Sequence, residues 1–133
     1  MRIVMTILFV LSASFAAAQD RGADIRDVIS RQLEAFEADD FEAAHELASP
    51  FIQDKFGTVE NFGQMVRDAY PVVHRHGRVD FGGLEDVGGR LVQRVYTTDA
   101  GGRLFELQYE MIQTEDGWKI NGVQVLQAKS VGA

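Results

Sequence analysis

Residues 104–112 alternate between apolar and polar side chains, strictly so from 105 to 111, and this pattern constrains the fold more than any other feature of the chain. Because successive side chains of a β-strand point to opposite faces, the two classes would lie on opposite faces of one strand. The apolar face would carry Phe105, Leu107, Tyr109 and Met111. The polar face would carry Glu106, Gln108 and Glu110. One face packs and the other meets water, which is typical of an antiparallel sheet covered on a single side.

Three segments before residue 104 predict further strands. Residues 72–73 and 79–84 are weak strands interrupted by glycine, and residues 91–98 form a stronger one. Asp99-Ala100-Gly101-Gly102 then has the composition of a hairpin loop. In residues 91–98 both alternating sets contain apolar and polar side chains, so the pattern leaves open which set is buried.

The first half of the chain has helical periodicity. Apolar residues at three- and four-residue steps predict helices over about 24–38, from 41 to Ser49-Pro50, and from Gly57-Thr58 to Pro71, with a short connecting segment at 51–56. The stripe of the first helix is Ile25, Val28, Ile29, Leu33 and Phe36. Helices followed by strands predict an α+β fold, in which three N-terminal helices pack on the concave face of a curved, mainly antiparallel sheet of about four strands.

The last strand, within residues 115–126, changes the parity of its apolar positions halfway along. The even positions are Trp118 and Ile120, and the odd ones are Val123 and Val125. Uninterrupted pairing from a two-residue turn at Asp116-Gly117 would place Gln124 beside Tyr109 on the apolar face. We therefore predict a β-bulge at Asn121-Gly122, which sets Val123 opposite Met111 and Val125 opposite Tyr109 and bends the sheet.

The first 18 residues have the composition of a signal peptide. Arg2 precedes an apolar run from Ile3 to Phe15, and Ala16-Ala17-Ala18 supplies small residues, so we expect cleavage before Gln19. The run is shorter than the roughly 20 apolar residues that span a bilayer. An uncleaved anchor is the alternative. Residues 19–133 would then form one exported domain, periplasmic or secreted.

Composition narrows the partners. The chain has 13 basic and 20 acidic side chains, a formal net charge of −7. Nucleic acids and anionic membranes both select clustered Lys and Arg, so the charge argues against either as a partner. The chain contains no cysteine, which excludes disulfides, thiol chemistry and cysteine-based metal sites.

Four segments carry a resemblance to a known family: "DDFEAAHELASPFIQDKFG", "FGQMVRDAYPVV", "GRLVQRVYTTDAGGRLFELQYEM" and "DGWKINGV". With the order of elements, they resemble the domain of unknown function 4864 family over about residues 25–127. That family belongs with the nuclear transport factor 2-like superfamily of cone-shaped, cystatin-like α+β domains. The superfamily includes isomerases, dehydratases, cyclases and non-catalytic binding modules, so the resemblance implies a fold and leaves the activity open.

The polar residues of the helical half have structural interpretations. Asp39 and Asp40 precede a predicted helix, and Glu42 stands three residues after Asp39 as in a capping box, so we expect these aspartates to cap the helix. His45 lies beside an apolar stripe and is expected to be half-buried or at the surface.

His74-Arg75-His76 is the most suggestive polar group. On a strand, histidines two residues apart project to the same face and could bind zinc or copper. No third ligand stands at a convincing spacing, so we expect no metal and no cofactor. Exposed edge-strand histidines, or one histidine at the mouth of the cone near Tyr70, are the preferred interpretation.

A candidate ligand pocket combines aromatic walls with one cation, which suits a small anionic or aromatic ligand. Its residues are Tyr70, His74, Arg94, Tyr109 and Trp118. The alternative places Tyr109 and Trp118 in the core with their polar ends at the rim.

The sequence therefore favours a non-catalytic module that binds a small ligand or a protein, with no catalytic residue assigned. One alternative is an isomerase- or dehydratase-like enzyme that uses the cone, with His74 or a pocket tyrosine as the acid–base group. The other is an interaction domain that docks through the outer face of the sheet, for example as a homodimer.

Overall fold

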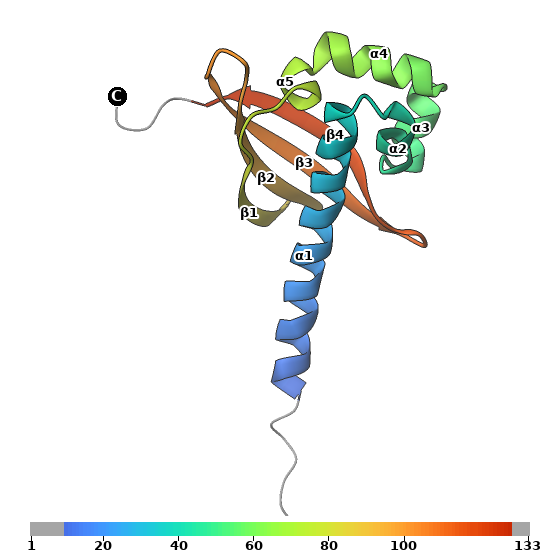
Figure 1. The fold of residues 1–133 in the computed structure, drawn as a ribbon. Coiled ribbons are helices and arrows are strands. Elements are labelled where there is room, and N and C mark those ends of the chain that lie inside the picture. Colours follow the sequence, from blue (N-terminus) through green and yellow to red (C-terminus); the bar gives the residue numbers. More distant parts are fainter. Residues whose placement is uncertain (1–9, 129–133) are drawn as a thin grey trace, which may run out of the picture.

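The computed structural model describes residues 10–128, in which helices precede strands (Figure 1). The helices are α1 (Val10–Glu37), α2 (Phe41–Glu46), α3 (Pro50–Phe56), α4 (Val59–Ala69) and α5 (Pro71–His74). The strands are β1 (Asp80–Val87), β2 (Arg90–Thr98), β3 (Leu104–Thr114) and β4 (Gly117–Gln127).

The strands form one antiparallel sheet in the order β1-β2-β3-β4. The helices lie over one face of this sheet (Figure 1). The C-terminal part of α1 crosses this face, and its first turns extend beyond the strands. The predicted stripe of α1 faces the core, because its five apolar members are at most 6% exposed. The predicted α+β fold is confirmed. The described residues form five helices of different lengths, where three were expected.

The N-terminal part of α1 overlaps the predicted signal peptide. The helix begins at Val10 rather than near residue 24, so residues 10–18 of that segment are helical. Residues 1–9 lie outside the described range. Among the described helices, none is both long and apolar enough to cross a membrane.

The helical half differs from the prediction between residues 47 and 56. The second helix ends at Glu46, and residues 50–56 form α3 instead of a connecting segment. Ser49 caps α3 by accepting a hydrogen bond from the Ile52 N–H at 3.2 Å, and Pro50 occupies the first helical position. Proline fits there because its fixed φ suits a helix and its missing N–H would be unpaired anyway.

The strand predicted at residues 72–73 is wrong. These valines lie in α5 and are 5% and 3% exposed. Pro71 begins this short helix, so the position that stops α4 also starts α5. Two β-branched residues favour a strand only weakly, and burial against the other helices outweighs that preference.

The sequence left open which face of β2 is buried, and in the structure it is the face that carries the odd-numbered residues. Gln93, Val95 and Thr97 are at most 2% exposed. They pair with Tyr109, Leu107 and Phe105 of β3, so the predicted apolar face of β3 continues across the sheet.

The predicted bulge in β4 is confirmed, although the register around it differs. The β3–β4 turn pairs Thr114 with Gly117, which shifts the pairing by two residues from the predicted one. Met111 pairs with Ile120 and Glu110 with Gly122, so Asn121 is the extra residue. Val123 then lies opposite Tyr109 and Val125 opposite Leu107, which keeps the inner face apolar on both sides of the bulge.

Candidate functional site

An apolar cavity of about 220 Å³ lies between the helices and the bulge of β4. Phe36 of α1, Ile52 and Phe56 of α3, and Phe62 and Val66 of α4 line it. Val73 of α5 and residues 120–123 of β4 complete the wall. Phe51 also lines the cavity, and its 62% exposed side chain marks the open side.

The bulge residue fixes α3 against the sheet. The Ser49 hydroxyl donates to Asn121 Oδ1 at 2.7 Å, and Asn121 Nδ2 donates to Glu110 Oε2 at 2.6 Å. The backbone of the α2–α3 connection also pairs with β4, because Ser49 N–H donates to the Ile120 carbonyl and Ile120 N–H to that of Leu47. The bulge that curves the sheet therefore also positions the cavity wall formed by α3.

The chemistry of the lining is mainly apolar. Among the lining residues the charged side chain is that of Lys55, on the last turn of α3. The other polar side chains are those of Gln32, Tyr70 and Asn121. Gln32 donates through Nε2 to the Ala44 carbonyl at 3.0 Å, and both ends of the Asn121 amide are already hydrogen-bonded.

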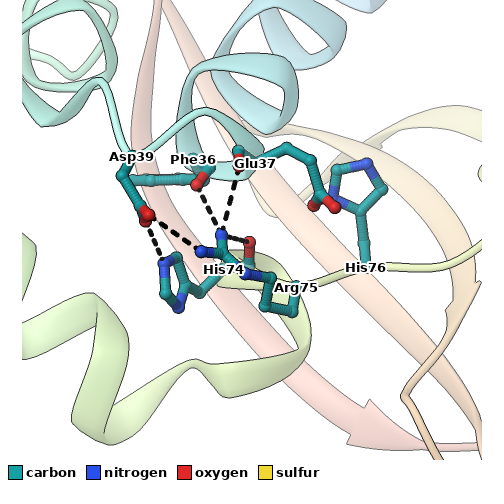
Figure 2. A network of polar contacts seen from close by, with 6 residues as sticks. All are labelled: Phe36, Glu37, Asp39, His74, Arg75 and His76. Atoms are coloured by element: carbon teal, nitrogen blue, oxygen red, sulfur yellow. Dashed lines mark hydrogen bonds and ion pairs between the residues drawn. The ribbon is translucent and has the colours of Figure 1, made fainter.

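A polar network joins the end of α1 to α5, and we call it the Asp39 network (Figure 2). Asp39 Oδ1 lies 2.7 Å from His74 Nε2, and Asp39 Oδ2 accepts from Arg75 at 2.9 Å. Arg75 also donates to the carbonyls of Phe36 at 2.9 Å and Glu37 at 3.4 Å. These carbonyls belong to the last turn of α1, beyond which the helix supplies no further donors. The Phe36 carbonyl also accepts from the Asp39 N–H at 3.0 Å. Arg75, which directly follows α5, thus caps the C-terminus of α1.

The conformation of Asp39 explains why it does not cap α2. Its φ is 56°, and the backbone bonds from Asp39 to Phe36 and from Asp40 to Ala35 end α1 in a Schellman motif. The predicted capping role therefore falls to Asp40 alone, whose Oδ1 accepts from the Ala43 N–H at 3.1 Å. For Asp39 the prediction of a helix cap is wrong. The hydrogen bond from His74, followed by that from Arg75, lowers the pKa of the Asp39 carboxyl.

The two histidines of the His74-Arg75-His76 group do not share a strand face. His74 ends α5 and points to Asp39, whereas His76 follows the helix and lies 3.6 Å from a Glu37 carboxylate oxygen (Figure 2). In residues 10–128 no group of three His, Cys, Asp or Glu side chains has an arrangement that could hold a metal. His45 is half-buried, as expected, and its ring centre lies 5.3 Å from that of Phe62.

The structure does not bring the five candidate pocket residues together. Tyr70 lines the apolar cavity, His74 belongs to the Asp39 network, and Trp118 lines a separate polar groove beside α1 and α2. Arg94 is on the outer face of the sheet, paired with Glu85 at 2.8 Å.

Tyr109, the fifth candidate, is fully buried on the inner face of the sheet. Burial raises the pKa of its phenol, and its hydroxyl has no hydrogen-bond partner among the described residues. The sequence prediction missed Lys55 and Phe51, because both lie in the segment that it left as a connection. The apolar residues Phe51, Ile52 and Phe56 were the available signal.

Comparisons with known proteins agree with this architecture. A crystal structure of a nuclear transport factor 2-like protein with a cystatin-like fold, from Novosphingobium aromaticivorans, superposes with a TM-score of 0.52. It is 17% identical in sequence, and the match covers 97% of this chain and 95% of that one, which shows a shared fold. No curated protein matches the chain in sequence. The family model for the domain of unknown function 4864 matches residues 18–133, and the chain therefore belongs to that family.

Proposed function

We propose that the protein is an exported, non-catalytic module that binds a small, largely apolar ligand in the cavity between α1, α3, α4 and β4. The cavity itself carries this proposal, since it combines apolar walls with an open side at Phe51. Ligand sites in proteins are typically concave and apolar with a few polar groups.

The size of the cavity limits the ligand. An apolar protein cavity of about 150 Å³ is large enough to hold benzene. At about 220 Å³, this cavity would hold one ring with a small substituent, or a branched aliphatic group of similar volume.

The lining favours binding over acid–base catalysis. Isomerase-type chemistry requires a general base within hydrogen-bond reach of the substrate. In the described part of the chain, the lining includes no histidine and no carboxylate. His74, the base of the enzyme alternative, is engaged by Asp39 outside the cavity lining.

The outer face of the sheet is less suited to apolar docking. Arg94 is paired there with Glu85 and lies 3.7 Å from Glu106, and Arg90 is paired with Glu110. Exposed ion pairs of this kind are typical of a solvated face. Export is supported by the N-terminal composition and by the family match, which begins at residue 18, beside the expected cleavage site.

Thermal unfolding with small single-ring compounds tests the proposal. A compound that binds the folded chain raises its stability by about 2.7 kcal/mol at 100 times its Kd, so we expect a concentration-dependent rise in Tm. Ile52→Trp fills the cavity and should abolish the rise, because Ile52 lines it. Val87→Trp adds a Trp side chain at the 44% exposed end of β1 and should leave the rise unchanged. Stabilisation that survives Ile52→Trp would place the ligand elsewhere and contradict the proposal.

A further inference from the structure

The cavity has a local charge opposite to that of the molecule. The chain carries 20 acidic side chains against 13 basic ones, yet the charged residue in the lining is Lys55. None of the acidic residues in the described range lines the cavity. Lys55 therefore contributes a positive charge beside the cavity, in a molecule whose net charge is negative.

Lys55 is one of the described cations that have no carboxylate partner. Arg21, Arg26 and Arg67 also have none, but these three do not line the cavity. Six arginines form ion pairs with nearby carboxylates: Arg31, Arg75, Arg78, Arg90, Arg94 and Arg103. Lys119 donates to the Glu46 carbonyl at 2.8 Å. By contrast, no carboxylate in the described part of the chain lies within 4 Å of the Lys55 ammonium, whose nearest recorded partner is the Phe56 ring, 5.6 Å away. Its ammonium therefore remains available to an anion.

The two amide side chains in the lining already use N–H groups in hydrogen bonds within the protein. Asn121 and Gln32 already direct their amide N–H groups to Glu110 and to the Ala44 carbonyl. The half-buried Tyr70 contributes a phenol, which can donate a hydrogen bond to an oxygen acceptor. The site thus combines an apolar interior with an ammonium and a phenol.

We propose that the ligand is a small apolar monocarboxylate, with its ring or branched body in the cavity and its carboxylate beside Lys55. This inference rests on the proposed function and adds the charge of the ligand. A lysine ammonium on a flexible four-carbon stem can follow a carboxylate at the mouth without a fixed geometry. The cavity volume restricts the body to about one ring, as in benzoate or cyclohexanecarboxylate.

Isothermal titration with matched pairs of probes tests this inference. Benzoate is compared with benzyl alcohol, and cyclohexanecarboxylate with cyclohexylmethanol, at pH 7 and low salt. We expect each carboxylate to bind the unmodified chain about three- to tenfold more tightly than its neutral partner. This is the range of an ordinary hydrogen bond, since Lys55 is exposed and water weakens the interaction. The preference should decrease at 1 M salt, where the Debye length is about 3 Å.

Two variants separate Lys55 from general charge effects. Lys55→Gln should reduce the preference to about one, while the alcohols bind as before. Arg78→Gln removes one positive charge from a side chain that is 84% exposed and away from the cavity lining, and it should keep the preference. Equal binding of acid and alcohol to the unmodified chain, or a preference that survives Lys55→Gln, overturns the inference while the proposed function stands. If no probe of either kind binds, both proposals fail together.

Discussion

The apolar cavity and the Asp39 network meet at a single residue. The side chain of Phe36 lines the cavity, whereas its carbonyl accepts a hydrogen bond from Arg75 at 2.9 Å. The cavity walls are held by burial, which is non-directional and scales with the apolar area removed from water. The network is held by charge-assisted hydrogen bonds, which require fixed partners at fixed distances. Burial thus supplies the stability of this region, and the network sets how α5 lies against the end of α1.

Phe36→Ala removes the apolar side chain that lines the cavity and should cause the largest loss of stability among these variants. The side chain is 2% exposed and packs 6.0 Å from the ring centres of both Phe41 and Phe62. Truncating a buried phenylalanine costs about 3–5 kcal/mol, while the carbonyl that binds Arg75 is retained. Urea unfolding measures this loss. Phe51→Ala makes the same change at a 62% exposed site and should cost less than about 0.5 kcal/mol. Equal losses in the two variants would contradict the assignment of Phe36 to the core.

Ser49→Ala tests the junction between the bulge and α3, where burial and hydrogen bonding act together. Ser49 is fully buried, caps α3 and donates to Asn121 Oδ1. Removing its hydroxyl loses a helix cap and leaves a part-buried amide oxygen without its donor, so we expect a loss of about 1–3 kcal/mol in urea unfolding.

Thr58→Ala is the matched control for Ser49→Ala. Thr58 caps α4 in the same way, accepting from the Asn61 N–H at 3.1 Å, but its side chain is exposed and makes no contact with the bulge that the structure records. We expect it to cost about 1 kcal/mol, the typical effect of a lost cap. If both variants lose the same stability, the hydroxyl of Ser49 contributes only as a cap and the link to Asn121 is unimportant.

The apolar part of this region could largely be predicted from the sequence. Helical and strand periodicity placed the stripe of α1, the inner face of β3 and the bulge at Asn121, because burial leaves a local pattern in the chain. The register of β4 was two residues off, since the type of a tight turn depends on backbone angles that Glu115-Asp116-Gly117 does not specify uniquely.

The polar part could not be predicted, for a physical reason. Asp39 and His74 are 35 residues apart, and no periodicity links them. A pair of aspartates before a helix equally predicts two caps, and only the left-handed conformation of Asp39, where glycine is usual, turns its carboxylate away from α2. Lys55 was missed because α3 is too short to show a helical pattern of its own.

The pH dependence of stability tests the contribution of the Asp39 network, and this should be the smallest of the predicted effects. The pKa of Asp39 is lowered in the folded protein, first by the hydrogen bond from His74 and then by that from Arg75. In the unfolded chain an aspartate titrates near its ordinary value, about 3.9. The unfolded state therefore binds more protons as pH falls through this range, so the contribution of Asp39 is fully present above about pH 4 and is lost in acid.

Asp39→Asn isolates this contribution, because asparagine tolerates the left-handed conformation and carries no charge. We expect the variant to be less stable than the unmodified chain at pH 6, and the difference to shrink as pH is lowered from 4 toward 2, measured as urea midpoints at each pH. Asp116→Asn removes an exposed carboxylate from the β3–β4 turn and should show no such convergence. A constant difference between Asp39→Asn and the unmodified chain would mean that the loss does not come from the charge of Asp39, which would contradict the prediction. The polar side of the comparison would then rest on Arg75 and the carbonyls of α1 alone.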